Sequence, residues 1–385
     1  MNIAFFCHSL LSDWNNGNAH FLRGLAGELA GLGHRVRCYE ERDAWSVRNL
    51  QAEQANLGAS GLSKHYPDLL IERYATATFD LDAALDADLV LVHEWNEPQL
   101  IARIGAARAR AGSRFRVLFH DTHHRSVSDH AVMSKLGVDE FDGVLAFGEA
   151  VRERYLRAGW AHRVWTFHEA ADTRVFRPLP QLERSADLVW IGNYGDGERS
   201  AELNEYLMEP AAALGLRGSV YGVRYPEEGR TAVQRAGLHY RGWLPNYRVP
   251  EVFARHRLTV HVPRRPYAEQ LPGVPTIRVF EALACGIPLL SAPWVDSEGL
   301  FREGDFLPVE NGARMRSALR QVLEDEQVAC ALAARGRETI LSKHTCWHRA
   351  KQLIAIAREL GCAAGPHVPA ASTTFPPNPR SERCH

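Results

Sequence analysis

Residues 275–290 read PTIRVFEALACGIPLL, and this stretch decides the fold. Its apolar residues recur at i, i+3 and i+7 from Ile277, so they form one face of a short helix. Arg278 and Glu281 lie on a neighbouring stripe with the same spacing. The helix ends at Gly286, and the apolar run that follows is typical of a buried strand. A short helix that leads directly into a buried strand indicates a parallel α/β sheet.

The same alternation of strand and helix continues along the rest of the chain. Segments such as NIAFFC, DLVLVHE and RFRVLFHD are typical of strands, and helical patterns of about 10 to 15 residues separate them. A proline-containing stretch, RPLPQLERS, interrupts the alternation, which restarts at DLVWIGN. The sequence therefore predicts an α/β fold of two Rossmann-like parallel-sheet domains that face each other across a cleft. Ligands of such sheets bind beyond the carboxyl ends of the strands, so the cleft is the expected site.

The predicted domain boundaries follow these changes of pattern. We expect an N-terminal domain over residues 1–180 and a C-terminal domain over residues 181–342. Residues 343–362 predict one further helix, which packs back on the N-terminal domain. The tail, residues 363–385, is rich in proline and serine and is expected to be disordered.

Composition argues against several classes of protein. The 385 residues are enough for two hydrophobic cores, and 45% hydrophobic with 24% charged residues is typical of a soluble globular protein. The formal net charge of −1 argues against a protein that binds nucleic acid through a broad basic surface. Seven scattered cysteines without a CxxC pair, the lack of a secretory signal and the lack of a long apolar run predict a cytoplasmic protein without a transmembrane segment.

The helix start near residue 276 has the chemistry of a phosphate site. Backbone N–H groups and the positive end of the helix dipole point out of the strand ends there, and Arg278 in the first turn adds a charged contact. Glu281, one turn later, can accept two hydrogen bonds from the vicinal hydroxyls of a ribose, as acidic residues do in dinucleotide folds. The alternative is a surface ion pair between Arg278 and Glu281, which stabilises a helix only slightly.

The stretch PTIRVFEALACGIPLL closely resembles the nucleotide-sugar-binding signature of GT-B glycosyltransferases, especially the CgeB-like branch and the family 1-4-like group. HEAADTRVFRP resembles the segment with which such enzymes leave the N-terminal domain, and TCWHRAKQLI resembles their C-terminal helix. The opening strand, loop and helix that end in GLGHRV resemble their first βαβ unit. The resemblance extends over almost the whole chain, to residue 362.

This resemblance implies a metal-independent glycosyltransferase with a GT-B fold and no cofactor. Such an enzyme transfers a sugar from a nucleoside diphosphate donor, here expected to be a UDP-sugar, to an acceptor hydroxyl on a glycan, lipid, protein or small molecule. The C-terminal domain would bind the donor and the N-terminal domain the acceptor. Many retaining GT-B enzymes carry a glutamate at the position of Gly273, where it contacts the transferred sugar, so the stereochemical outcome is not carried over.

Two stretches of the C-terminal half resemble the diphosphate-binding segments of these enzymes. In WIGNYGDGERS, Asn193 lies in a glycine-rich loop and Arg199 at the following helix start, although such glycines also serve simple turns. HVPRRPY places Arg264 and Arg265 just after a strand. One of these two arginines is expected to face the diphosphate and the other to face solvent.

Two further stretches complete the predicted donor site. YRGWLP, with Gly242 and Trp243, resembles the nucleobase pocket, although a tryptophan here can equally be buried between helix and sheet. Gly17 and Asn18 lie in a loop where similar enzymes let the backbone approach the leaving diphosphate, although Asn18 can also serve as a helix N-cap. The complete predicted donor set is Gly17, Asn18, Asn193, Arg199, Gly242, Trp243, Arg264, Arg265, Thr276, Ile277, Arg278 and Glu281.

FHDTHHRSVSDH, residues 119–130, contains the densest group of histidines and follows a strand. In one interpretation His120 or His123 is the general base for the acceptor hydroxyl and Asp121 orients the ring. In a second the group binds a divalent metal, and in a third its side chains only bond within the loop. GT-B enzymes stabilise the diphosphate with helix dipoles and basic groups, so no metal site is predicted. The predicted catalytic set is His120, Asp121, His123 and Arg278, and the predicted acceptor side is His93, Glu94 and His124.

Three other functions remain open from the sequence. A sugar-nucleotide epimerase of the same fold would bind the donor and need no acceptor. A metal-dependent hydrolase would be built on the His120–His130 cluster. A non-catalytic binder would hold the sugar nucleotide without turning it over.

Overall fold

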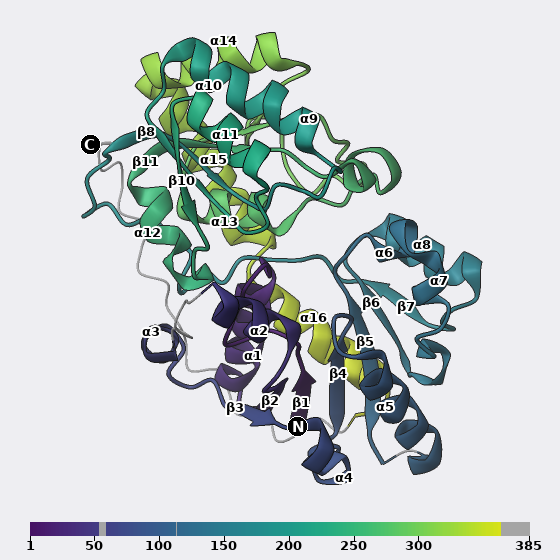
Figure 1. Ribbon diagram of the computed structural model, residues 1–385. Helices are drawn as coiled ribbons and strands as arrows, with labels where there is room; N and C mark the ends of the chain where they lie inside the picture. Colours follow the sequence, from purple (N-terminus) through teal and green to yellow (C-terminus); the bar gives the residue numbers. More distant parts are fainter. Residues whose placement is uncertain (54–58, 113, 363–385) are drawn as a thin grey trace.

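The computed structural model describes residues 1–53, 59–112 and 114–362, and Figure 1 shows them as two lobes, each built around its own sheet. The tail that the sequence predicts to be disordered, residues 363–385, lies outside the described residues. No helix within the described ranges has both the length and the apolar composition that crossing a lipid bilayer requires.

The first sheet has seven strands, all parallel, in the order β3-β2-β1-β4-β5-β6-β7. Its central strands are buried on both faces, which explains the continuous apolar run LVLV in β4. The strand order reverses between β1 and β4, and open α/β sheets bind ligands in the crevice at such a reversal. The strands are β1 (Asn2–Phe6), β2 (Arg35–Glu41), β3 (Ile71–Tyr74), β4 (Leu89–His93), β5 (Arg116–Asp121), β6 (Gly143–Ala146) and β7 (Val164–Thr166).

The second sheet has six parallel strands in the order β10-β9-β8-β11-β12-β13. Its order reverses between β8 and β11, so it presents a crevice of the same kind. The predicted pair of parallel α/β sheets is therefore confirmed. The strands are β8 (Ala186–Ile191), β9 (Gly218–Tyr221), β10 (Leu238–Gly242), β11 (His256–His261), β12 (Leu289–Ser291) and β13 (Leu307–Pro308).

Helices connect successive strands in both lobes (Figure 1). Those of the first lobe are α1 (Ala19–Gly31), α2 (Trp45–Ala52), α3 (Ala59–His65), η1 (Thr76–Thr78), α4 (Leu81–Ala84), α5 (Pro98–Ala111), α6 (Arg125–Ser128), α7 (His130–Met133), η2 (Val138–Glu140) and α8 (Glu149–Ala158). Those that follow are α9 (Ser200–Leu203), η3 (Asn204–Met208), α10 (Glu209–Leu214), α11 (Glu227–Arg235), η4 (Asn246–Arg248), α12 (Val249–Ala254), η5 (Pro266–Gln270), α13 (Ile277–Cys285), α14 (Gly312–Glu324), α15 (Glu326–Lys343) and α16 (Cys346–Glu359).

The sequence patterns missed the two edge strands, β3 and β13. Three of the four residues of β3 are at least partly exposed, and β13 has only two residues, so neither carries a recognisable apolar run. The helix predicted near residues 199–214 is present as the continuous series α9, η3 and α10.

The chain passes between the two lobes twice, and the two passages lie side by side. Ala171 N–H donates to the carbonyl of His344 (2.9 Å), and Cys346 N–H donates to the carbonyl of Ala171 (3.0 Å). From there α16 packs along α1 in the first lobe, as Figure 1 shows. One apolar cluster contains residues of α1, α16 and α13, so the two lobes share a core beneath the cleft. This shared core holds the carboxyl ends of the two sheets toward each other.

Candidate functional site

A cleft of about 900 Å³ lies between the two lobes. Its walls come from the loops after β1, β4 and β5 on one side, and from the loops after β8, β9 and β11 with the start of α13 on the other. These are the carboxyl ends of the strands, where this kind of sheet binds ligands. The predicted site residues that line the cleft are Gly17, Asn18, His123, His124, Asn193, Arg199, Trp243, Arg264, Thr276, Ile277 and Arg278.

The start of α13 forms part of the cleft wall. Thr276 precedes the helix in extended backbone, and its hydroxyl makes no helix cap but lies 3.1 Å from Nε2 of His261. The positive end of the helix dipole therefore faces the cleft without a side-chain cap. Gly17 packs against this helix start, because a Cβ at residue 17 would come within 2.8 Å of Cγ2 of Ile277. Glycine at this position lets the N-terminal loop approach the helix closely.

Arg199 is buried in the C-terminal wall, and the glycine-rich loop makes room for it. Gly195 has φ +98°, and a Cβ there would lie 2.4 Å from Cγ of Arg199. The guanidinium group donates to Oδ1 of Asn193 (2.6 Å) and to the carbonyl of Val262 (3.1 Å), and it lies over the ring of Trp190. Its Nε has no hydrogen-bond partner in the described part of the chain.

Arg199, Arg264 and Arg278 converge on the same part of the cleft, and we call these three side chains the arginine wall. Burial, together with the positive charges of Arg264 and Arg278, lowers the pKa of Arg199 to about 10. Loss of hydration is the larger cause, and the repulsion shows that the three positive charges lie close enough to act on one another. The arginine wall is therefore suited to an anion.

The two neighbouring arginines after β11 have different surroundings, as the sequence led us to expect. Arg264 faces the cleft, where it pairs with Glu198 and donates to Oδ1 of Asn193 (3.0 Å). Arg265 has a 44% exposed side chain, does not line the cleft and pairs with Glu202 (3.0 Å). Of the two arginines, Arg264 is the one that lines the cleft, and its contact with a diphosphate stays a prediction.

Glu281 is fully buried and does not line the cleft. Its Oε1 lies 2.9 Å from Nδ1 of His20 and accepts from the Asn246 amide (3.2 Å), and its Oε2 pairs with Arg278. The ribose contact predicted for Glu281 stays a prediction, and it requires the donor to displace one of these three partners. In the present arrangement the carboxylate anchors Arg278 and ties α13 to α1.

The loop after β1 holds the first lobe's contacts to the opposite wall. Asn18 does not cap α1 with its side chain; its amide donates to Oγ1 of Thr122 (2.8 Å). Asn15 accepts a hydrogen bond from the amide of Asn193 across the cleft (2.8 Å). The buried Glu40 carboxylate fixes the loop by accepting from the backbone N–H groups of its residues 10 and 11.

His123 and His124 are the two histidines of the cluster that reach the cleft. Burial and the neighbouring His124, Arg264 and Arg125 hold the pKa of His123 well below its usual value, and Nδ1 of this ring has no partner among the described residues. Burial also lowers the pKa of His124 to about 4, and its Nδ1 lies 2.9 Å from Oγ of Ser128. Both rings are therefore neutral near pH 7, and the unpartnered nitrogen of His123 can accept a proton.

His120 and His93 lie beneath the cleft and do not line it. His120 is completely buried between Phe21 and Phe167, and burial lowers its pKa to about 3. The prediction that His120 serves as the base is therefore corrected, because its ring cannot reach an acceptor. His93 is 1% exposed, and its Nε2 lies 3.2 Å from Oγ1 of Thr122, so it supports the loop after β5.

Asp121 and Glu94 form a buried pair of carboxyl groups under the same loop. Asp121 accepts from the Tyr155 hydroxyl (2.8 Å) and from the backbone N–H of His123 (3.1 Å). It therefore positions the backbone of this loop, whereas the sequence predicted that it orients an imidazole ring. Glu94 accepts from Thr122 N–H (2.7 Å) and pairs with Arg125. Burial and the neighbouring Asp121 raise the pKa of Glu94 to about 8. Neither group lines the cleft.

The predicted nucleobase pocket falls on the part of the cleft formed by the loops after β9 and β10. Trp243 lines the cleft beside Val223 and Leu244. Gly242 does not line it; its carbonyl accepts from Gly222 N–H (2.8 Å), which brings the two loops together, and its φ is +71°.

The lining residues that the sequence analysis missed include Trp45, Trp95 and Glu169. Trp95 lies between the Arg125 guanidinium on one side and the edge of His123 on the other. Trp95 follows DLVLVHE and Glu169 is the last residue of HRVWTFHE, two segments that the sequence identifies as strands. Position just past a parallel strand was thus a usable signal for both, while Trp45 lies in α2, for which no pattern was found.

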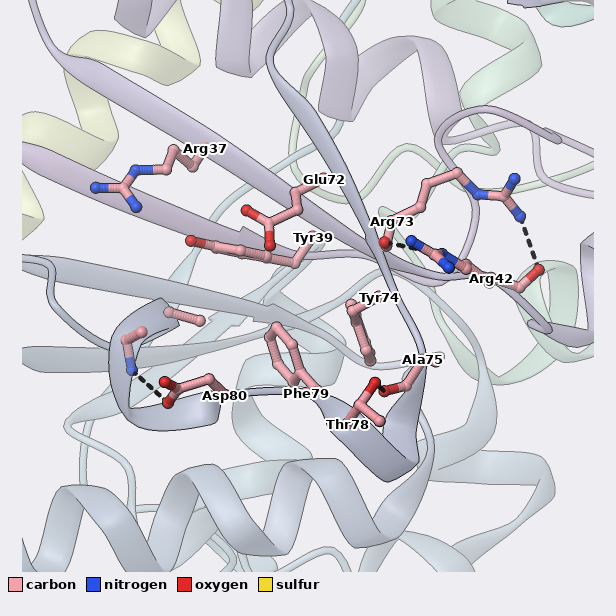
Figure 2. A pocket seen from close by; sticks show the side chains of 12 residues that line it. Arg37, Tyr39, Arg42, Glu72, Arg73, Tyr74, Ala75, Thr78, Phe79 and Asp80 are labelled. Atoms are coloured by element: carbon pink, nitrogen blue, oxygen red, sulfur yellow. Dashed lines mark hydrogen bonds between the residues drawn. The ribbon is translucent and has the colours of Figure 1, made fainter.

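A second hollow, of about 320 Å³, lies at the edge of the first sheet beside β2, β3 and α4 (Figure 2). Two of its three arginines bond to each other's backbone: Arg42 donates to the carbonyl of Arg73, and Arg73 donates to the carbonyl of Arg42. The ring of Phe79 stacks on Tyr74 and makes a tilted contact with Tyr39 there. We take the cleft between the lobes, and not this hollow, as the functional site.

Within the described ranges no group of three or more His, Cys, Asp or Glu side chains is placed to hold a metal ion, so the metal interpretation of the histidine cluster gains no support.

Comparison with known proteins agrees with this architecture. A family described as Glycosyl transferase-like matches residues 199–355. No curated protein matches the chain. Solved structures with the same fold include sucrose-phosphate synthase from Thermosynechococcus elongatus, with 15% identity and a TM-score of 0.63 over 94% of this chain and 100% of that one.

Two further structures were determined with a nucleotide bound. Anabaena HepE in complex with UDP and glucose has 14% identity and a TM-score of 0.66 over 93% of this chain and 100% of that one. T4 phage BGT in complex with its UDP-glucose substrate has 14% identity and a TM-score of 0.59 over 94% of this chain and 99% of that one. The fold of the chain is that of GT-B glycosyltransferases, and residues 199–355 are similar to the glycosyl transferase-like family.

Proposed function

We propose that this chain transfers a sugar from a UDP-sugar to a hydroxyl group of an acceptor. The observation that carries the proposal is the arginine wall, where three guanidinium groups meet at the uncapped start of α13. Two adjacent phosphates carry enough negative charge to neutralise such a site, and helix N-termini bind phosphate groups readily. We assign donor binding to the domain of residues 181–342 and acceptor binding to the domain of residues 1–180.

In the proposed reaction the bond between C1 of the sugar and the diphosphate oxygen breaks, and C1 forms a bond to the acceptor oxygen. The electron pair of the broken bond leaves with UDP. The arginine wall and the α13 dipole stabilise the negative charge that grows on the diphosphate, which is often the largest contribution to catalysis. The proton of the acceptor hydroxyl moves to Nδ1 of His123, because this residue lines the cleft and its buried Nδ1 has no partner among the described residues.

The choice of a UDP-sugar is supported by structural relatives. Anabaena HepE was crystallised with UDP-glucose, and T4 phage BGT with its UDP-glucose substrate. In this chain Trp243 and the loop 222–224 line the cleft where the base would lie. We also place the chain in the CgeB-like branch on its RVFEALACG motif, and in the cytoplasm on its free, buried cysteines Cys7, Cys38, Cys285, Cys346 and Cys362.

Calorimetry with UDP and with uridine tests the diphosphate site directly. We expect UDP to bind at least roughly a hundredfold more tightly than uridine, because only UDP engages the charge-assisted contacts of the arginine wall. Equal affinities would overturn the assignment. Incubation with a panel of UDP-sugars then separates the possible reactions: sugar transfer that depends on an added acceptor supports the proposal, and a sugar isomer formed without any acceptor indicates an epimerase.

A further inference from the structure

Glu169 is a buried carboxyl group that lines the cleft and that the proposed reaction does not yet use. It lies where the chain passes from the first lobe to the second, and the residue is only 3% exposed. Its Oε2 has no hydrogen-bond partner among the described residues, and no basic side chain in those ranges forms an ion pair with it. A buried carboxyl oxygen without a partner destabilises a fold, so its presence at a cleft suggests a ligand that supplies the partner.

The surroundings of Glu169 are acidic where the opposite wall is basic. Burial and the nearby Glu281 and Glu94 carboxylates raise the pKa of Glu169 well above its usual value, and a hydrogen bond from Asn18 opposes them. The arginine wall, by contrast, lines the same cleft from the second lobe. The cleft is thus basic on one side and carries a carboxyl group on the other, which matches a ligand with an anionic part and a part rich in hydroxyl groups.

The N-terminal loop connects Glu169 to the start of α13. Asn18 bonds with Glu169, and its neighbour Gly17 packs directly on Ile277 at the first residue of the helix. A diphosphate bound at the α13 start would therefore present its attached sugar beside Asn18 and Glu169. Sugar hydroxyls can donate to the unpartnered oxygen of this carboxyl group, whereas ionised phosphate oxygens carry no proton to donate.

We propose that Glu169 accepts a hydrogen bond from a hydroxyl of the transferred sugar and so helps to select that sugar. This inference rests on the proposed function. The inference also supplies a sugar contact in a chain that has glycine at residue 273, where many retaining GT-B enzymes have the sugar-binding glutamate. The space beside Gly273 is filled by Glu298. Glu298 is already engaged by His168 (2.7 Å) and by the backbone N–H of Glu149 (2.8 Å), so it is not available to a sugar. Glu169, by contrast, has a carboxyl oxygen, Oε2, without a hydrogen-bond partner among the described residues.

The test compares UDP with UDP-sugars on Glu169→Ala and Glu169→Gln, with the exposed Glu153→Gln of α8 as the matched control. UDP-glucose, UDP-galactose and UDP-N-acetylglucosamine are the probes, and the wild-type protein identifies which of them is turned over. For that sugar we expect Glu169→Ala to bind roughly tenfold more weakly, while UDP binds as before, because one hydrogen bond is lost from the sugar alone. Melting curves check that each variant is folded.

The outcomes separate this inference from the proposed function. Unchanged affinity for the UDP-sugar in both Glu169 variants overturns the sugar contact and leaves the transferase proposal standing. An equal loss for UDP and UDP-sugar also overturns it, since a purely structural role would weaken both. Failure of the wild-type protein to bind UDP at all overturns the proposed function and this inference together.

Discussion

The two walls of the cleft differ in the charge that their buried groups keep at pH 7. In the C-terminal wall, burial lowers the pKa of Arg199 only to about 10, so the guanidinium group stays charged at pH 7. In the N-terminal wall, burial lowers the pKa of His124 to about 4 and holds that of His123 well below its usual value, so both rings are neutral. Removal from water disfavours the charged form in both walls, and the starting pKa of each residue type decides the result. One wall can therefore attract an anion while the other can receive a proton.

The largest expected effect is the loss of kcat when the proton acceptor of the N-terminal wall is removed. Substitution His123→Phe keeps a ring against Trp95 but removes the nitrogen that accepts the acceptor's proton. We expect kcat to fall by roughly 100- to 10,000-fold, the range of general-base catalysis, with little change in donor affinity. Steady-state kinetics with saturating donor measure the first quantity and calorimetry with UDP the second.

The neighbouring buried histidine provides the control. His120→Phe should leave kcat unchanged, because its ring packs between Phe21 and Phe167 and does not line the cleft. Equal losses in the two variants would mean that the histidine side contributes packing and not proton transfer.

The next largest effect, on kcat and on UDP binding, is expected when a positive charge is removed from the arginine wall. Arg278→Ala should reduce kcat by roughly 100- to 1,000-fold and also weaken UDP binding, because the guanidinium group acts on charge that grows in the transition state. The matched control is Arg265→Ala, since Arg265 is exposed and pairs with Glu202 away from the cleft. Arg278→Lys keeps the charge and should recover part of the loss. An effect of Arg278→Ala on binding alone would contradict the catalytic role.

The same contrast explains what the sequence could predict about the site. The anion-binding side is encoded in short segments: Arg278 and Glu281 lie one helical turn apart, and Arg199 follows its glycine-rich loop directly. Local spacing and the family resemblance therefore pointed to arginines that the structure places at the cleft, and their contact with a diphosphate stays a prediction. The position of Glu281 behind Arg278 was not predictable, because it depends on His20 from the other lobe.

The histidine side depends on where the strand ends, and spacing does not reveal this. His120 is still within β5 and faces the core, while His123 has left the sheet and reaches the cleft, although only three residues separate them. Glu169 was missed for a similar reason: its importance comes from the meeting of two distant segments. The fold was more predictable, since alternating apolar strands and amphipathic helices are repeated along the chain, and only short edge strands such as β13 escaped.

A smaller effect sharpens the assignment of Glu281. Glu281→Ala should weaken UDP binding by roughly 1–3 kcal/mol, the scale of hydrogen bonds to a charged group, because Arg278 loses its anchor and the ribose its predicted partner. Calorimetry with UDP and 2′-deoxy-UDP separates the two causes. If Glu281 binds the ribose, the wild-type protein prefers UDP and the variant does not. If the variant keeps the full preference, Glu281 only anchors Arg278.

The smallest effect concerns stability and tests the neutral state of the buried histidines. The pKa of His120 is about 3 in the folded chain, against a usual value near 6.5, so between these values the unfolded chain binds more protons than the folded one. The free energy of unfolding therefore falls as pH drops below 6.5, and His120 alone accounts for about 1 kcal/mol between pH 7.5 and 5.5. His120→Phe removes this contribution, so the wild-type protein should lose about 1 kcal/mol more than the variant over that interval in urea titrations. Parallel pH dependence of the two proteins would mean that His120 is charged, or exposed to water, in the folded state, and the contrast between the two walls would then not extend beneath the cleft.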